Sequence, residues 1–241
     1  HLVRQGKTVV HYTLELNEAY VGLRYDTVFS GTPTANIKFH QEEVQKVIDG
    51  LKGKLIIKYY PTRSASVNTL AAHLKQMEIQ EIKPDVVIVD YADILKPTTF
   101  YKEKRHATGE TYENLRGMAG EFDIPIWTAS QANRSSLEEE IIDASKVSED
   151  YSKVMTADFV MSVSRKVEDK IANTGRVHVI KNRFGIDGIT FPAEINTNTG
   201  NIQVYEASTQ GGKSTQGKMD NSEEYLRQTL SKKYNDMGGF E

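Results

Sequence analysis

The sequence predicts an α/β protein in which a mostly parallel sheet is flanked by helices on both faces. Short runs of apolar and β-branched residues alternate along the chain with longer segments whose apolar residues recur at helical spacing. Most of the short runs are apolar throughout, which is typical of parallel strands that are buried on both faces. The expected strands of this sheet lie at 8–12, 55–60, 85–90, 124–129 and 158–164.

Helices are expected between these strands. Asn17 can cap a helix that runs to about residue 28, and residues 67–77 place Leu70 and Leu74 on one apolar face. A strand at 175–182, a turn and a further strand follow, which predicts a late antiparallel hairpin at one edge of the sheet. The remaining expected helices and strands lie at 41–51, 111–122, 201–205 and 223–234.

Composition divides the chain into a core, residues 1–206, and a tail, residues 207–241. The stretch 207–220 is dominated by Gly, Ser, Thr, Gln and Lys, so we expect a flexible linker there, followed by a short helix. The helix has two interpretations, a loose end of the chain or a docking element for a partner.

The overall charge does not indicate a nucleic-acid-binding protein. The formal net charge is −3, so a site for DNA would need a local basic patch or a ring built from several subunits. The chain has no cysteine, which excludes disulfides and zinc–thiolate sites. No apolar run reaches the roughly 18 residues that a membrane-spanning helix needs.

The strongest chemical signal is the run PDVVIVDY, in which a buried strand ends at Asp90. Ligands of open parallel sheets sit at the carboxyl ends of the strands, and an acid placed there can hold Mg²⁺, usually through water. This arrangement is typical of the second nucleotide motif of P-loop enzymes. The alternative is a buried strand that happens to end in an acid.

Four further polar residues lie at or just after the ends of expected strands. Glu15 comes after the first strand, where a carboxylate can polarise the water that attacks a γ-phosphate; a solvated or capping acid is the alternative. Gln131 follows strand 124–129 and can sense the γ-phosphate, or is simply a polar strand end. Lys181 and Arg183 lie at the late hairpin and can reach a neighbouring subunit's ATP, or form a solvated basic turn. Their order along the chain is that of an ATPase.

With these motifs in place, the chain resembles the RecA-like motor domain of DnaB-type replicative helicases, above all those of T-even-type tailed phages. The fold that the resemblance implies is a RecA-like P-loop NTPase core. The matching stretches are TVVHYTLEL, LIIKYYPTRSASVNTLAAHL, PDVVIVDYADIL, LRGMAGEFDIPIWTASQANR, TADFVMSVSR and VIKNRFG, which span about residues 1–206.

The resemblance implies a role for each site residue and ATP with Mg²⁺ as the cofactors. It makes Glu15 the catalytic glutamate and Asp90 the acid of the second nucleotide motif, which holds the metal. It makes Gln131 the residue that couples the γ-phosphate to DNA. Lys181 and Arg183 then act in trans on the nucleotide of the neighbouring subunit.

The resemblance also implies partners: a homo-hexamer that threads single-stranded DNA, unwinds duplex at the fork, and is served by a primase and a helicase loader. It implies a phage protein in the cytoplasm of the bacterial host cell. The DNA-gripping segments would be 96–110 and 143–155, with Lys146 and Lys153 as phosphate contacts. The basic-acidic-Gly motif of bacterial members is replaced here by Ser148-Glu149-Asp150.

The family's phosphate loop, Gly-x-x-x-x-Gly-Lys-Ser/Thr, lies just before the helix whose last turn residues 1–7 resemble. We therefore expect this loop and its strand to be missing, with a gap or a rearranged sheet beside the Asp90 strand and very weak ATP binding. Residues 207–214 fit a relaxed phosphate-loop pattern but are interpreted as linker, because no packed helix follows them.

Two other functions remain open from the sequence. A RecA-type recombinase that forms filaments on DNA would share the fold and the positions of Asp90 and Gln131, although the Lys-x-Arg hairpin favours the helicase. A non-catalytic interaction module is the alternative from a different functional class, because a chain without the phosphate loop lacks part of its nucleotide site.

Overall fold

The computed structural model describes residues 1–207 except 100–103, 134–138, 140 and 145–150. The predicted linker beyond Ala207 and the predicted terminal helix lie outside the described residues. The chain forms two compact units. The first contains His1–Gln131 and a segment that ends at Ala157. The second contains the described residues between 132 and 144 together with those from Asp158 onward.

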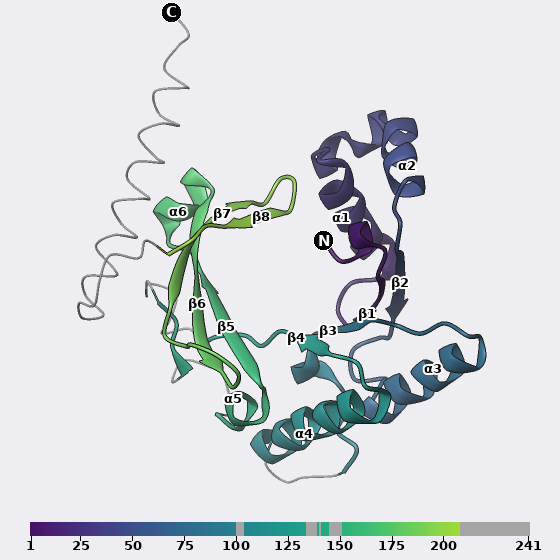
Figure 1. The fold of residues 1–241 in the computed structure, drawn as a ribbon, viewed down its shortest axis with the longest axis vertical. Helices are drawn as coiled ribbons and strands as arrows, with labels where there is room; N and C mark the ends of the chain where they lie inside the picture. Colours follow the sequence, from purple (N-terminus) through teal and green to yellow (C-terminus); the bar gives the residue numbers. More distant parts are fainter. Residues whose placement is uncertain (100–103, 134–138, 140, 145–150, 208–241) are drawn as a thin grey trace, which may run out of the picture. The chain divides into compact units, whose positions relative to one another are not determined.

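A parallel four-stranded sheet forms the centre of the first unit (Figure 1). Its strand order is β2-β1-β3-β4, and all three neighbouring pairs are parallel. The strands therefore present all their carboxyl ends at one edge. Their bounds are β1 Thr8–Thr13, β2 Lys54–Tyr59, β3 Val86–Asp90 and β4 Ile126–Thr128.

Helices cover both faces of this sheet, as expected from its apolar strands. On one face, α3 and α4 bury the main core, in which Val10 and Tyr12 of β1 meet Leu70 and Leu74 of α3. On the other face, Val9 packs with α1 and with residues that flank α2. The helices are α1 Glu18–Ser30, α2 Gln41–Asp49, α3 Val67–Ile79, α4 Lys104–Phe122 and α5 Ser152–Thr156, with short 3₁₀ turns at Val3–Gln5, Thr34–Phe39 and Ala92–Ile94.

Local sequence sets the ends of α1. The side chain of Asn17 accepts a hydrogen bond of 3.0 Å from the backbone N–H of Tyr20, which satisfies one of the free donors of the first turn. Gly31 ends the helix in a left-handed conformation (φ +74°) that side chains rarely adopt. The predicted cap at Asn17 is therefore confirmed.

The second unit contains an antiparallel sheet of order β5-β6-β7-β8 and the short helix α6. The pairing of β5 with β6 contains a register shift between Val160 and Met161. The bounds are β5 Phe159–Ser164, α6 Val167–Ala172, β6 Thr174–Asn182, β7 Thr190–Asn196 and β8 Asn201–Val204.

One detail of the predicted sheet is wrong. The late strands form a sheet of their own instead of an antiparallel edge of the parallel sheet, because within the described residues no strand pairs with the outer side of β4. Of the two arrangements expected beside the Asp90 strand, a gap or a rearranged sheet, the gap is not found, because β3 has β1 on one side and β4 on the other.

We expect Leu70→Ala to lower the free energy of unfolding by about 2–5 kcal/mol, because Leu70 is fully buried between α3 and the sheet. Urea unfolding followed by circular dichroism measures the change. Ile79→Ala is the matched control from the same helix, because Ile79 is 83% exposed. Equal losses of stability in the two variants would contradict this account of the core.

Candidate functional site

The carboxyl ends of β1, β3 and β4 meet at one edge of the parallel sheet. Thr13 lies opposite Asp90 in the β1–β3 pair, and the backbone N–H of Leu14 donates a hydrogen bond of 2.9 Å to the carbonyl of Asp90. In the next pair, Val89 lies opposite Thr128. The register thus brings Glu15, Asp90 and Gln131 to the ends of three adjacent strands.

The carboxylate of Asp90 is accessible at this edge, with 39% of its side chain exposed. One of its oxygens lies 3.9 Å from Nε2 of His11, a residue of β1 whose side chain is only 11% exposed. On its other side, Nδ1 of His11 is 2.8 Å from the hydroxyl of Tyr25 in α1. Asp90 therefore has one face toward solvent and one toward a buried imidazole.

Burial dominates the electrostatics beneath Asp90. Loss of solvent lowers the pKa of His11 below its ordinary value, and the negative charge of Asp90 only partly opposes this. Burial, together with the charge of Asp90, raises the pKa of Tyr25 to about 12. Both groups are thus neutral at physiological pH, with the imidazole uncharged and the phenol protonated.

Glu15 is exposed in the turn that follows β1. Two side-chain hydroxyls fasten this turn: that of Thr13 donates to the carbonyl of Leu16 at 2.6 Å, and that of Thr62 donates to the carbonyl of Leu14 at 2.9 Å. The backbone on both sides of Glu15 is therefore held in place, while its carboxylate faces solvent.

The segment after β4 is tied to the segment after β3. The hydroxyl of Thr128 donates to the carbonyl of Val89 at 2.8 Å and accepts from the backbone N–H of Ala92 at 3.0 Å. Nε2 of Gln131, an exposed residue, donates to the hydroxyl of Tyr91 at 3.3 Å. Gln131 therefore contacts the residue that directly follows Asp90.

A second acid, Asp93, lies close to this edge with 11% of its side chain exposed and accepts three hydrogen bonds. Its partners are the amino group of Lys153 at 2.9 Å, the hydroxyl of Tyr112 at 2.8 Å and the hydroxyl of Ser130 at 2.9 Å. Lys153 also donates to Ser130 at 3.0 Å. The cluster joins α4 and α5 to the segments that carry Asp90 and Gln131.

The structure buries Lys153, which the resemblance had placed among the contacts to DNA phosphates. Its side chain is only 3% exposed, because the ion pair with Asp93 draws it inward and its amino group lies 5.6 Å from the ring centre of Tyr112. The helices α4 and α5 also occupy parts of the two segments expected to be loops. Lys146 lies outside the described residues.

Lys181 and Arg183 belong to the second unit. Lys181 lies within β6, one residue before its end, and not in the turn itself. Arg183 is the first residue after β6, is exposed, and forms an ion pair of 2.8 Å with Asp158. The backbone N–H of Arg183 also donates to the carbonyl of Asp158 at 2.9 Å, so both contacts tie this end of β6 to the start of β5.

The edge suits a magnesium ion that is held mainly by water and by a ligand's own oxygens. Among the described residues no three His, Asp or Glu side chains gather into a metal site. An accessible carboxylate such as that of Asp90 can still hold Mg²⁺ through water, as is common where phosphates supply the other oxygens.

No described helix is long and apolar enough to cross a membrane.

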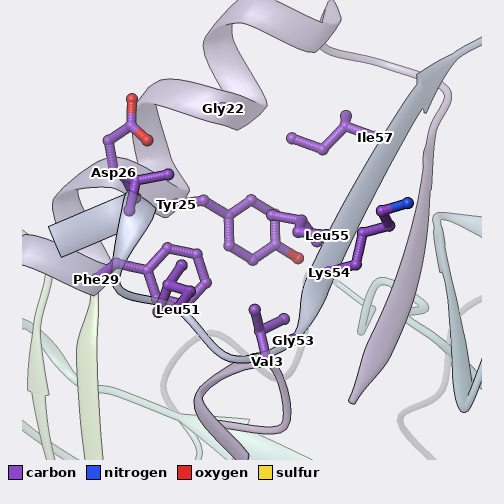
Figure 2. A pocket seen from close by; sticks show the side chains of 11 residues that line it. Val3, Gly22, Tyr25, Asp26, Phe29, Leu51, Gly53, Lys54, Leu55 and Ile57 are labelled. Atoms are coloured by element: carbon purple, nitrogen blue, oxygen red, sulfur yellow. The ribbon is translucent and has the colours of Figure 1, made fainter. Parts of the chain in front are cut away.

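A separate pocket of about 260 Å³ lies between α1, β2 and the turns around Val3 and Leu51 (Figure 2). Figure 2 shows the ring of Tyr25 reaching from α1 into this pocket, with the ring of Phe29 beside it. The lining is largely apolar, and neither Glu15, Asp90 nor Gln131 contributes to it.

Sequence reasoning missed His11, Asp93 and Tyr25. His11 is one position of the apolar run TVVHY, and Asp93 is one of several polar residues that follow a strand. A polar residue inside a buried strand is itself a signal, because such groups need a partner. The identity of the partner depends on α1, which lies too far along the chain for local patterns to reveal.

Comparison with known proteins gives one family. The model of the DnaB-like helicase C-terminal domain matches residues 2–196. The DnaB-like replicative helicase of Enterobacteria phage T4 is 31% identical over 137 residues, which are 55% of this chain and 29% of that protein. The chain thus matches less than a third of the length of that relative.

Two solved structures share the fold. One is described as an ATPase domain; it superimposes with a TM-score of 0.72 at 18% identity, covering 85% of this chain and 76% of that one. The other is a DnaB-like replicative helicase, described with its interactions with primase. It superimposes with a TM-score of 0.71 at 18% identity, covering 83% of this chain and 51% of that one. The fold is therefore that of RecA-like helicase ATPase domains.

We expect Lys153→Met to lower the free energy of unfolding by about 3–5 kcal/mol, because it leaves the buried carboxylate of Asp93 without its cation. Urea unfolding of the chain measures the loss. Lys75→Met is the matched control, since Lys75 pairs with Glu121 at 2.8 Å on the surface and should matter far less. A loss no larger than that of the control would show that the pair contributes nothing.

Proposed function

Since the chain belongs to the DnaB-like helicase C-terminal domain family, we propose that it is the ATP-hydrolysing motor of a replicative DNA helicase. The observation that supports this most is the meeting of Glu15, Asp90 and Gln131 at one edge of the parallel sheet. Ligands of such sheets bind at the carboxyl ends of the strands. The edge offers an acid for a metal, an acid for a water and an amide for a phosphate.

Each residue has a defined task in this proposal. Bound Mg²⁺–ATP supplies the reacting phosphate and the cation that neutralises it. Asp90 would hold the Mg²⁺ with its accessible carboxylate, and Glu15 would accept a proton from the attacking water. Gln131 hydrogen-bonds the γ-phosphate. Its contact with Tyr91 lets the segments after β3 and β4 respond together.

The proposal needs a second subunit. Lys181 and Arg183 would donate to the γ-phosphate held by the neighbouring molecule in a homo-hexamer. Arg183 suits this task because it is exposed at the end of β6, and guanidinium groups bind phosphate oxygens in pairs of hydrogen bonds.

Single-stranded DNA would pass through the centre of the ring and would be moved by hydrolysis. Segments near 96–110 and 143–155, including Lys146, remain the proposed contacts to its phosphates. Primase is a proposed partner because the DnaB-like helicase with a similar fold is described with that interaction. The site of action would be the cytoplasm of a phage-infected bacterium.

We expect Glu15→Gln in the intact protein to slow ATP hydrolysis at least about 100-fold while leaving ATP affinity within about threefold, because only the proton acceptor is lost. A coupled assay gives the rate, and fluorescent-nucleotide titration gives the affinity. Glu42→Gln, an exposed change on α2, is the control. Wild-type hydrolysis by Glu15→Gln would remove Glu15 from this role.

A mixing experiment tests the contribution from the second subunit. Arg183→Ala alone should reduce hydrolysis about 10³-fold or more, as expected for an arginine that acts in trans. Mixing it with Glu15→Gln should restore part of the activity, because some interfaces then combine an intact Glu15 with an intact Arg183. If the hydrolysis rate of no mixture exceeds the sum of the rates of the two variants, the site is not shared between subunits.

Electron microscopy of the intact protein would separate the rings of a helicase from the filaments of a recombinase.

A further inference from the structure

The imidazole of His11 lies beneath Asp90 with one ring nitrogen unused. His11 and Asp90 are diagonal neighbours on the same face of adjacent strands, because His11 pairs with Ile88 and Thr13 pairs with Asp90. In the described part of the chain, the buried Nε2 of His11 has no hydrogen-bond partner. Its nearest acidic group is the Asp90 carboxylate at 3.9 Å.

A buried ring nitrogen without a hydrogen-bond partner lowers the stability of the folded protein. Leaving a buried polar group without a partner costs about 1–3 kcal/mol, so such a group is normally satisfied in the working state of a protein. A shift of the Asp90 carboxylate by about 1 Å would bring its oxygen within the roughly 2.7–3.2 Å of a hydrogen bond. Asp90 is accessible enough to make this shift, whereas His11 is enclosed by β1, β3 and α1.

Tyr25 determines which nitrogen of His11 carries the proton. Its hydroxyl has a single hydrogen, and Nδ1 of His11 at 2.8 Å is its one hydrogen-bond partner among the described residues. If Nδ1 carried the proton, the hydroxyl hydrogen of Tyr25 would have no acceptor and the lone pair of Nε2 would face a carboxylate. Donation from Tyr25 to Nδ1 avoids both problems and places the N–H on Nε2, toward Asp90.

We propose that His11 is a positioning residue for Asp90: its Nε2–H, fixed in place by Tyr25, donates to one carboxylate oxygen and orients the other, which would hold the metal. This inference rests on the proposed role of Asp90. Groups that hydrogen-bond a metal-binding side chain from behind set its orientation, and losing one typically costs about 10–100-fold in metal affinity or activity.

The tautomer can be observed without nucleotide or metal. Long-range ¹H–¹⁵N correlation spectra of the chain at neutral pH should show His11 with its proton on Nε2, and Tyr25→Phe should increase the fraction with the proton on Nδ1. A proton on Nδ1 of His11 in the unmodified chain would overturn the proposal directly.

The catalytic part is tested with a matched pair of substitutions in the intact protein. In His11→Gln, the side-chain amide can keep a donor near the position of Nε2, so the Mg²⁺ concentration for half-maximal ATP hydrolysis should stay within about threefold of wild type. His11→Leu removes the donor and should raise this concentration about tenfold or more. A purely structural His11 would instead change the amount of folded protein and leave the Mg²⁺ midpoint unmoved.

Asp90→Asn in the same assay tests the role of Asp90 in hydrolysis separately from the positioning role of His11. If Asp90→Asn abolishes hydrolysis and the Mg²⁺ midpoints of His11→Leu and His11→Gln equal that of wild type, the positioning role fails and the proposed function stands. If Asp90→Asn hydrolyses ATP like wild type, the proposed role of Asp90 fails, and the role of His11 fails with it.

Discussion

The pairing of β1 with β3 is the constraint on which the candidate site depends. It places Thr13 opposite Asp90 and, through the backbone bond from Leu14 to Asp90, fixes where the turn that carries Glu15 begins. Side chains alternate between the faces of a strand, so a shift of β3 by one residue would turn Asp90 away from His11 and into the core beneath α3 and α4. One register therefore sets both the accessible acid and its buried neighbour.

The same edge contains two acids with opposite environments. Asp90 is partly exposed and has room for a ligand, whereas Asp93, three residues later, has 11% of its side chain exposed and is saturated by Lys153, Tyr112 and Ser130. A buried carboxylate is stable only when its charge and hydrogen bonds are satisfied. Asp93 can therefore serve as an anchor for α5, while Asp90 remains available for chemistry.

Local patterns were sufficient for the parallel sheet and for the position of Asp90, since continuous apolar runs and a terminal acid need no distant partner to be recognised. They do not reveal the burial of Lys153, which the resemblance to the helicase family had placed among the phosphate contacts. Its burial depends on Asp93, 60 positions away along the chain. They also failed for the late strands, because whether an antiparallel strand joins an existing sheet depends on which edges are open. The roles expected for Glu15 and Gln131 came from the resemblance to the helicase family and stay predictions.

The ion pair of Arg183 shows how a residue can be both held and available. Arg183 and Asp158 are each more than 40% exposed, and exposed pairs of this kind contribute only about 0–1 kcal/mol. Hydrogen bonds from a guanidinium to phosphate are roughly twice as strong as neutral ones. In the proposed ring, Arg183 could therefore leave Asp158 for a neighbour's γ-phosphate at little cost. The buried pair of Lys153 with Asp93 could not open in this way, because separating it would leave a charge without a partner away from water. The exposed pair is thus the one that suits a contact made and broken in each cycle.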